Sequence, residues 1–162
     1  MYKRQPHEFA RALESTGAAF AGKEAKARAY ILAAYVWAVL ARSPGPARKA
    51  IERAAEQGEP KKNLARYARM LASVVEDGEW YEAATATLLS EELAAGEAAS
   101  LRFELLRANL VREQGGSALR ILEEMAKGER GAHVATLLTA LLPPSCLGLT
   151  RDEISGLSLI HI

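Results

Sequence analysis

Three short segments of this chain repeat the same arrangement, a turn followed by the start of an alanine-containing helix. They are RSPGPARKAIERA (42–54), EDGEWYEAATATL (76–88) and EQGGSALRILEEM (113–125), each with glycine in the turn. The alanines near the start of the second helix are Ala50, Ala83 and Ala118, which are 33 and 35 residues apart. Periods of this size are typical of helical-hairpin repeats. One hairpin cannot bury both of its apolar faces, so we expect neighbouring hairpins to stack and share a core.

Helical signals dominate the rest of the chain. No stretch alternates apolar and polar residues with β-branched enrichment over the length of a strand. We expect helices over residues 7–16, 23–42, 46–57, 61–76, 79–94, 97–114, 117–127 and 130–142. The predicted fold class is therefore all-α, with one helical repeat domain over residues 1–142 and a loop with an irregular tail over 143–162.

The segment GEWYEAA (78–84) resembles part of a tetratricopeptide repeat. Gly78, Trp80 and Ala83 stand where that family has a turn glycine, an aromatic residue and an alanine of the second helix. Ala50 and Ala118 fall at the equivalent alanine of the other two segments. The resemblance covers roughly residues 30–128 as three degenerate repeats, and it implies a right-handed α-solenoid of antiparallel hairpins. A different α-hairpin solenoid is the alternative.

The first helices of the three hairpins are less regular than the second. Ala38 suits the family's small residue in the first repeat, and the corresponding positions are Leu71 and Arg107 in the other two. Apolar residues at helical spacing predict a packing stripe in each helix. The residues predicted to pack in these stripes include the three second-helix alanines, Gly78 and Trp80, together with Trp37, Leu119 and Leu122.

The resemblance also implies where a partner would bind. In that family the first helix of each hairpin lines an inner groove that holds a protein or peptide. By position, the groove would contain Leu32, Tyr35, Val39, Arg42, Ala65, Ala68, Ala72, Val75, Leu101, Glu104 and Ala108. This groove is largely apolar and lacks the Lys/Asn set that captures a C-terminal carboxylate in some relatives. It would suit an apolar helix or an extended segment.

No constellation of residues in the sequence indicates catalysis, a cofactor or a metal. His7, His133 and His161 are far apart, and no HxxxH, HExxH or CxxC motif occurs. Cys146 lies in PPSCLG, a predicted loop without an orienting partner in view. We therefore expect a binding scaffold without enzymatic activity. The alternatives are a regulatory or sensor region of a larger signalling protein or transcription regulator, and a helical enzyme whose site lies elsewhere.

Charge and compartment signals are weak. The net charge of +1 does not favour nucleic acid. Residues 42–69 hold eight Lys/Arg against three Glu, which indicates either a solvated surface or a basic strip that meets an acidic partner.

The apolar run 29–41 would extend about 20 Å as a helix, too short for the roughly 30 Å of a bilayer core. A single cysteine and the lack of a signal peptide favour the cytoplasm.

The last residues carry a further expectation. LSLIHI (157–162) resembles the translated adapter tail that ends many reading frames assembled from environmental DNA, and a natural frayed terminus is the alternative. The predicted helix 130–142 presents an apolar stripe, and no full-length capping helix follows it. Solenoids cover such a stripe with a capping helix. We therefore expect at least one more hairpin in the natural protein, and self-association of this chain through its uncapped C-terminal repeat.

Overall fold

The computed structural model describes residues 5–112 and 114–127, and within these ranges all regular structure is helical. The elements are α1 (Gln5–Ala19), α2 (Lys23–Tyr35), the π-helical turn η1 (Val36–Leu40), α3 (Pro44–Glu56), α4 (Lys61–Val74), α5 (Gly78–Leu89), α6 (Ala95–Val111) and α7 (Gly115–Ala126). The predicted all-α class is confirmed for these residues. The predicted helix 130–142 and the tail 143–162 lie outside them.

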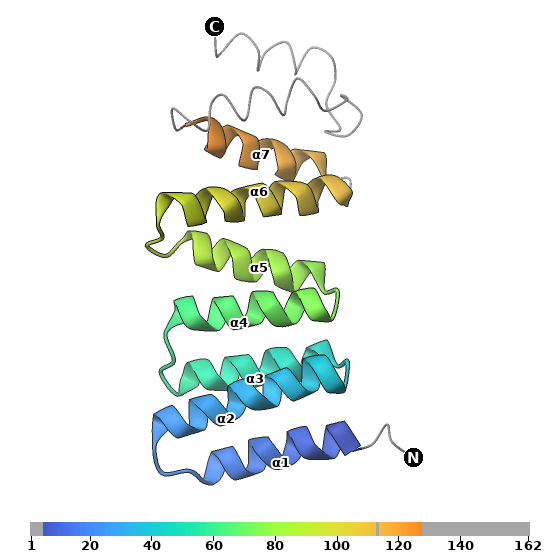
Figure 1. Cartoon of the computed structure of the whole chain (residues 1–162), viewed down its shortest axis with the longest axis vertical. Coiled ribbons are helices and arrows are strands. Elements are labelled where there is room, and N and C mark those ends of the chain that lie inside the picture. Colours follow the sequence, from blue (N-terminus) through green and yellow to red (C-terminus); the bar gives the residue numbers. More distant parts are fainter. Residues whose placement is uncertain (1–4, 113, 128–162) are drawn as a thin grey trace, which may run out of the picture. The chain divides into compact units, whose positions relative to one another are not determined.

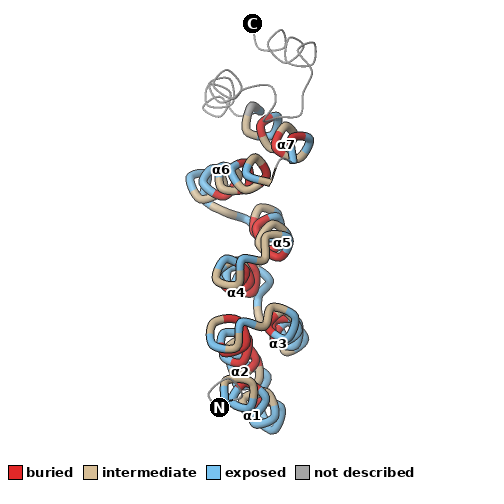
Figure 2. The backbone as a smooth tube through the Cα atoms, turned by 90° about the vertical axis from the view of Figure 1, so that its right-hand side faces the viewer, coloured by how far each residue is buried: buried red, intermediate tan, exposed pale blue. Residues whose placement is uncertain are grey.

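The contacts divide the chain into two compact units, whereas the sequence predicted one repeat domain over residues 1–142. The N-terminal unit is Met1–Glu91 and the C-terminal unit is Glu92–Ile162. In the N-terminal unit, α1 packs on α2, α2 on α3 and α4 on α5, as antiparallel neighbours joined by short turns (Figure 1). Within that unit, α2 and α4 lie on one side and α3 and α5 on the other (Figure 2). In the C-terminal unit, α6 packs on α7.

The core of the N-terminal unit is built mainly from alanine with a few large side chains. The fully buried alanines are Ala10, Ala33, Ala34, Ala38, Ala47, Ala50, Ala54 and Ala72. Leu71 and two tryptophans, Trp37 and Trp80, fill the space between the helices. Small side chains let helix backbones approach closely, and the large residues then restore the packing density.

Burial recurs along the chain with a spacing of 34 residues. The buried sets, each member 34 residues from the next, are Trp37, Leu71 and Leu105; Ala38, Ala72 and Leu106; Ala50, Ala84 and Ala118; and Ala54, Leu88 and Leu122. The first two sets lie in η1, which continues α2, and in the first helices α4 and α6, and the last two sets lie in the second helices α3, α5 and α7. The recurring positions therefore mark the buried side of each helix pair.

Ala83 does not belong to these sets, and its predicted packing role is wrong. Ala83 is exposed, whereas its neighbour Ala84 is 5% exposed and belongs to the core. Successive residues of an α-helix are about 100° apart around its axis, because there are 3.6 residues per turn. An error of one residue in the repeat therefore exchanges a buried position for an exposed one.

The same correction applies to the first helices. The residue equivalent to Ala38 is Ala72 in the second pair and not Leu71, and in the third pair it is Leu106 and not Arg107. Arg107 is exposed. The small residue thus recurs once, in the second pair, where the sequence had predicted a leucine.

Among the other residues predicted to pack, the tryptophans Trp37 and Trp80, the alanines Ala50 and Ala118, and Leu122 are buried. Leu119 is half-buried. Ala118 and Leu122 form the small core of the C-terminal unit together with Leu106.

Two turns between paired helices of the N-terminal unit have a left-handed residue that is not glycine. In the N-terminal unit, Arg42 and Glu76 have left-handed backbones with φ of 51° and 57°. After α4, the Asp77 amide donates to the Ala72 carbonyl at 2.9 Å, which closes the helix in the manner usually seen with a left-handed glycine. Gly78 is the half-buried first residue of α5 and has no positive φ.

Arg48 on α3 ties the first helix pair to the second. Its guanidinium pairs with the Asp77 carboxylate at 2.5 Å and lies over the Trp80 ring, 5.5 Å from the ring centroid. Asp77 also caps α5, because its second carboxylate oxygen accepts from the Trp80 amide at 3.1 Å. One carboxylate therefore starts a helix and joins it to the preceding pair.

Candidate functional site

An apolar groove lies between α2 and α4 in the N-terminal unit. It is lined by Arg28, Ile31, Leu32 and Tyr35 from α2 and by Tyr67, Met70 and Leu71 from α4, and its volume is about 260 Å³. Small-molecule sites usually measure about 300–1,000 Å³. A cavity of about 150 Å³ holds one benzene molecule. The groove therefore has room for one or two large side chains.

The walls of the groove are large side chains that remain open to water. The exposed fractions are 49% for Leu32, 44% for Tyr35, 38% for Tyr67 and 47% for Met70. The floor is less exposed, since Leu71 belongs to the core and Ile31 packs against it. Exposed apolar side chains are ordinary when they are scattered, but a contiguous set around a groove is typical of a binding surface.

Opposite flanks of two helices line this groove. On α2 the buried side carries Ala27, Tyr30 and Ala34, and the wall residues lie on one flank of that side. On α4 the buried side carries Leu64 and Ala68, and the wall residues lie on the other flank. Since α2 and α4 run in the same direction (Figure 1), the flanks that face each other must be opposite ones. The wall residues therefore do not occupy equivalent positions in the two helices.

The first pair contains four of the residues predicted to line a groove. Leu32 and Tyr35 are in the α2 wall. Val39 is half-buried and packs against the core. Arg42 is exposed, and its guanidinium donates to the Val74 carbonyl at 2.6 Å, so that it joins the end of η1 to the end of α4.

The groove positions predicted on α4 are wrong. Ala68 is 6% exposed and Ala72 fully buried, and Ala65 is buried as well. Val75, just after α4, packs against the core. A side chain without exposed surface cannot contact a partner, and these alanines instead allow the close approach of neighbouring helices. The prediction assumed equivalent positions in successive helices, which the opposite flanks do not provide.

Sequence reasoning missed Tyr67 and Met70 as wall residues. Both stand with Leu71 at apolar helical spacing, a pattern that by itself predicts packing in the core. The sequence feature that could have identified them is the stripe of alanines at Ala68 and Ala72, which lies beside Tyr67 and Met70 on the same helix. Where alanines already occupy the side that packs, large residues beside them are left at the surface.

The remaining predicted groove residues are on α6, in the C-terminal unit. Leu101 is 3% exposed and therefore buried. Glu104 and Ala108 are half-buried. Among the described residues of this unit, the exposed large apolar side chains are Phe103, at 47%, and Val111, at 78%.

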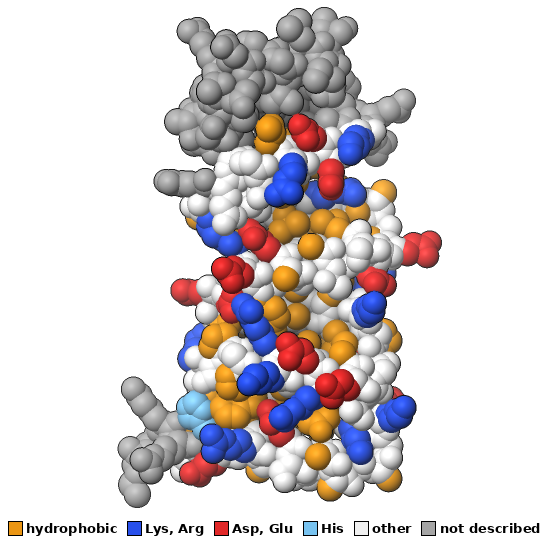
Figure 3. Space-filling view, turned by 180° about the vertical axis from the view of Figure 1, so that it is seen from behind, with side chains coloured by type: hydrophobic (Ala, Val, Ile, Leu, Met, Phe, Trp, Pro, Cys, Tyr) orange, Lys and Arg blue, Asp and Glu red, His pale blue; other side chains and the backbone are white. Residues whose placement is uncertain are grey.

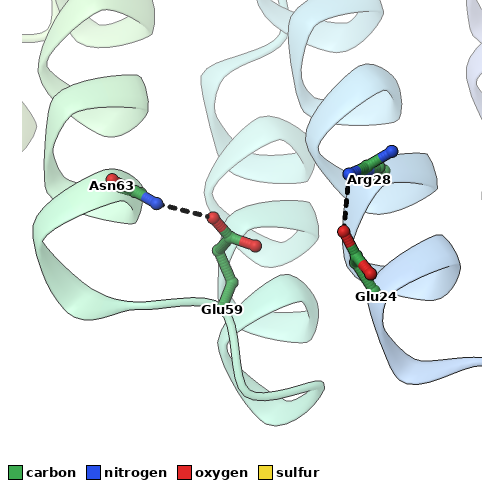
Figure 4. A network of polar contacts seen from close by, with 4 residues as sticks. All are labelled: Glu24, Arg28, Glu59 and Asn63. Carbon is green, nitrogen blue, oxygen red and sulfur yellow. Dashed lines mark hydrogen bonds and ion pairs between the residues drawn. The ribbon is translucent and has the colours of Figure 1, made fainter.

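Polar pairs lie near the start of α2 and of α4 (Figure 4). Arg28 on α2 pairs with Glu24 at 2.5 Å, and the two side chains are 75% and 76% exposed. The Asn63 amide on α4 donates to the Glu59 carboxylate at 3.0 Å. Arg28 is the charged residue among those that line the groove.

Among the described residues, the face seen from behind shows no patch of a single charge sign (Figure 3). In the view from behind, Lys, Arg, Asp and Glu side chains are interspersed with hydrophobic ones (Figure 3). Two members of the suggested basic strip have partners within the chain. Arg48 pairs with Asp77, and the Arg69 guanidinium donates to the Tyr81 hydroxyl at 3.2 Å. Such a mixture of charges is typical of a solvated surface.

Two further findings concern the residues that the structure describes. None of their helices is both long and apolar enough to cross a membrane. Their His, Cys, Asp and Glu side chains do not gather in groups of three or more that would hold a metal ion; Cys146, His133 and His161 lie outside the described residues. Comparison of the chain with protein-family models, with curated proteins and with solved structures found no match.

Proposed function

We propose that this chain is a helical-hairpin repeat module that binds a protein or peptide partner through the groove between α2 and α4. The observation that carries the proposal is the exposure of four large apolar side chains around one groove: Leu32, Tyr35, Tyr67 and Met70. Burying such side chains against a partner stabilises a complex in proportion to the apolar area that leaves water. The module contributes a surface and no catalytic step.

The recurrence of burial supports the repeat architecture. Four sets of buried residues with a spacing of 34 suit a tetratricopeptide-like right-handed α-solenoid, in which each hairpin is one repeat. In such an array the first helices of neighbouring hairpins line a common surface. The groove between α2 and α4 is formed by two such helices.

Selection from a random peptide display library on the full 162-residue chain tests this function. We expect binders whose affinity is lost when Leu32→Lys or Met70→Glu places a charge in the groove wall. Both residues are about half exposed, so these substitutions leave the core intact. Phe9→Glu is the matched control, because Phe9 on α1 is 53% exposed and does not line the groove.

The proposal predicts a specific pattern across these variants. Binders should lose about tenfold or more in affinity with either wall variant and keep their affinity with the control. Circular dichroism and urea melts establish that all three variants are folded. Binders that tolerate both wall variants would place the binding surface elsewhere and contradict the proposal.

A further inference from the structure

We infer that the segment held in this groove is an amphipathic helix, with two large apolar side chains in the groove and an acidic side chain at Arg28. This inference rests on the proposed function and specifies the partner. It combines the conformation that the groove can accept, the length of its walls and the charge at its end.

The conformation follows from the scarcity of hydrogen-bonding groups in the groove. Both walls are α-helices, whose backbone groups bond within each helix, and the described residues contain no strand with an edge to pair. The polar side-chain groups of the lining are the Arg28 guanidinium and the hydroxyls of Tyr35 and Tyr67. An extended peptide would lose water from its backbone amides without replacement bonds. A helix satisfies its own backbone, so it can enter an apolar groove at a lower cost.

The length of the groove sets the spacing of the anchors. On α2, the lining residues run from Arg28 to Tyr35, seven positions apart, which is about 10 Å at 1.5 Å per residue. On a partner helix the same distance separates residues i and i+7. An acidic residue at i with apolar residues at i+4 and i+7 therefore matches the groove, and so does the same pattern in reverse. A volume of about 260 Å³ accommodates the two apolar side chains.

The charge of the partner follows from Arg28. Its NH2 group donates to Glu24, but both side chains are three-quarters exposed, so this pair is mostly in water. A guanidinium has five N–H donors, and it can bind a second carboxylate without releasing the first. The combination of apolar walls and one cation thus selects an acidic, apolar helix face.

Two peptide libraries of equal length, displayed against the full chain, test this inference. The first places randomised positions on one face of an alanine-rich helix, and the second places them in a proline-containing extended peptide. We expect enrichment from the helical library alone, with two large apolar residues three or four positions apart and Asp or Glu one turn away. Arg28→Gln should weaken the best acidic peptide roughly three- to tenfold and leave its Glu→Gln version unchanged.

The outcomes separate this inference from the function on which it rests. Extended peptides that dominate and are lost with Met70→Glu would overturn the helical partner and keep the groove as a binding site. Peptides from either library that tolerate Met70→Glu would overturn the proposed function itself. Acidic and neutral helical peptides that respond equally to Arg28→Gln would overturn the assignment of the acidic side chain to Arg28.

Discussion

Replacing Ala84 with leucine should destabilise the N-terminal unit, whereas the same change at Ala83 should not. Ala84 is 5% exposed within the core, and Ala83 is exposed on the same helix. Leucine adds three carbon atoms, and at a packed site such an addition typically costs about 1–3 kcal/mol. Alanine and leucine differ little in helix propensity, so the two variants differ mainly in packing. At the exposed position we expect a change below about 0.5 kcal/mol.

Urea denaturation followed by tryptophan fluorescence measures this difference. The chain has two tryptophans, Trp37 and Trp80, and both are buried in the N-terminal unit. Trp80 precedes Ala84 by one helical turn, so its emission reports on the region that the substitution disturbs. With a urea m-value of about 1–3 kcal/mol/M, a loss of about 2 kcal/mol lowers the midpoint by roughly 1 M.

The result also tests the 34-residue recurrence. Ala50→Leu, one repeat earlier at a fully buried position, should cost about as much as Ala84→Leu. Ala118→Leu should destabilise the C-terminal unit, where circular dichroism replaces tryptophan emission as the probe. A neutral Ala84→Leu, or an Ala83→Leu that costs as much, would refute the assignment of Ala84 to the helix interface.

Three further predictions concern an ion pair with a helix cap, a left-handed residue and two glycines. In a double-mutant cycle, Arg48→Met and Asp77→Ala should show a coupling of about 0.5–1 kcal/mol, because their ion pair is partly exposed. Asp77→Ser retains an oxygen that can cap α5, so in urea melts it should lower the free energy of unfolding less than Asp77→Ala does. Glu76→Gly should raise the free energy of unfolding by up to about 1 kcal/mol, because φ is 57° at this position and glycine adopts a left-handed backbone without strain. A lowered urea midpoint would contradict this expectation. Gly17→Ala should destabilise by about 1–3 kcal/mol, since a β-carbon there would lie 2.5 Å from a side-chain carbon of α2, whereas Gly96→Ala has open space and should be neutral or stabilising in thermal melts.

Helices and turns were largely determined by local sequence. The predicted range 61–76 corresponds to α4 at Lys61–Val74, and 117–127 corresponds to α7 at Gly115–Ala126. Alanine favours a helix, and proline or aspartate marks where the helix starts, so a few neighbouring residues are enough to predict each helix. The predicted helix 79–94 is longer than α5, which ends at Leu89 with Ser90 as its C-cap. Helix ends, where several residues compete for the same role, were imprecise, and the predicted helix 23–42 did not include the π-helical turn η1.

The recurrence of the hairpins was also visible in the sequence, but its phase was not. The turn motifs placed the second helices correctly and missed the buried alanine of α5 by one residue, at Ala83 instead of Ala84. Two adjacent alanines are indistinguishable by composition. What separates them is which one faces α4, and that depends on how the two helices rotate against each other.

Contacts between distant segments were decided by the tertiary structure alone. Glu14 on α1 accepts from the Trp37 indole at 2.8 Å and pairs with Arg53 at 2.6 Å, partners that are 23 and 39 residues away. The groove walls have the same origin, since Tyr67 and Met70 line a groove only because α2 passes beside them. Local sequence sets the backbone bonds within each helix, whereas the choice of which flanks meet follows from packing two helices against a common neighbour.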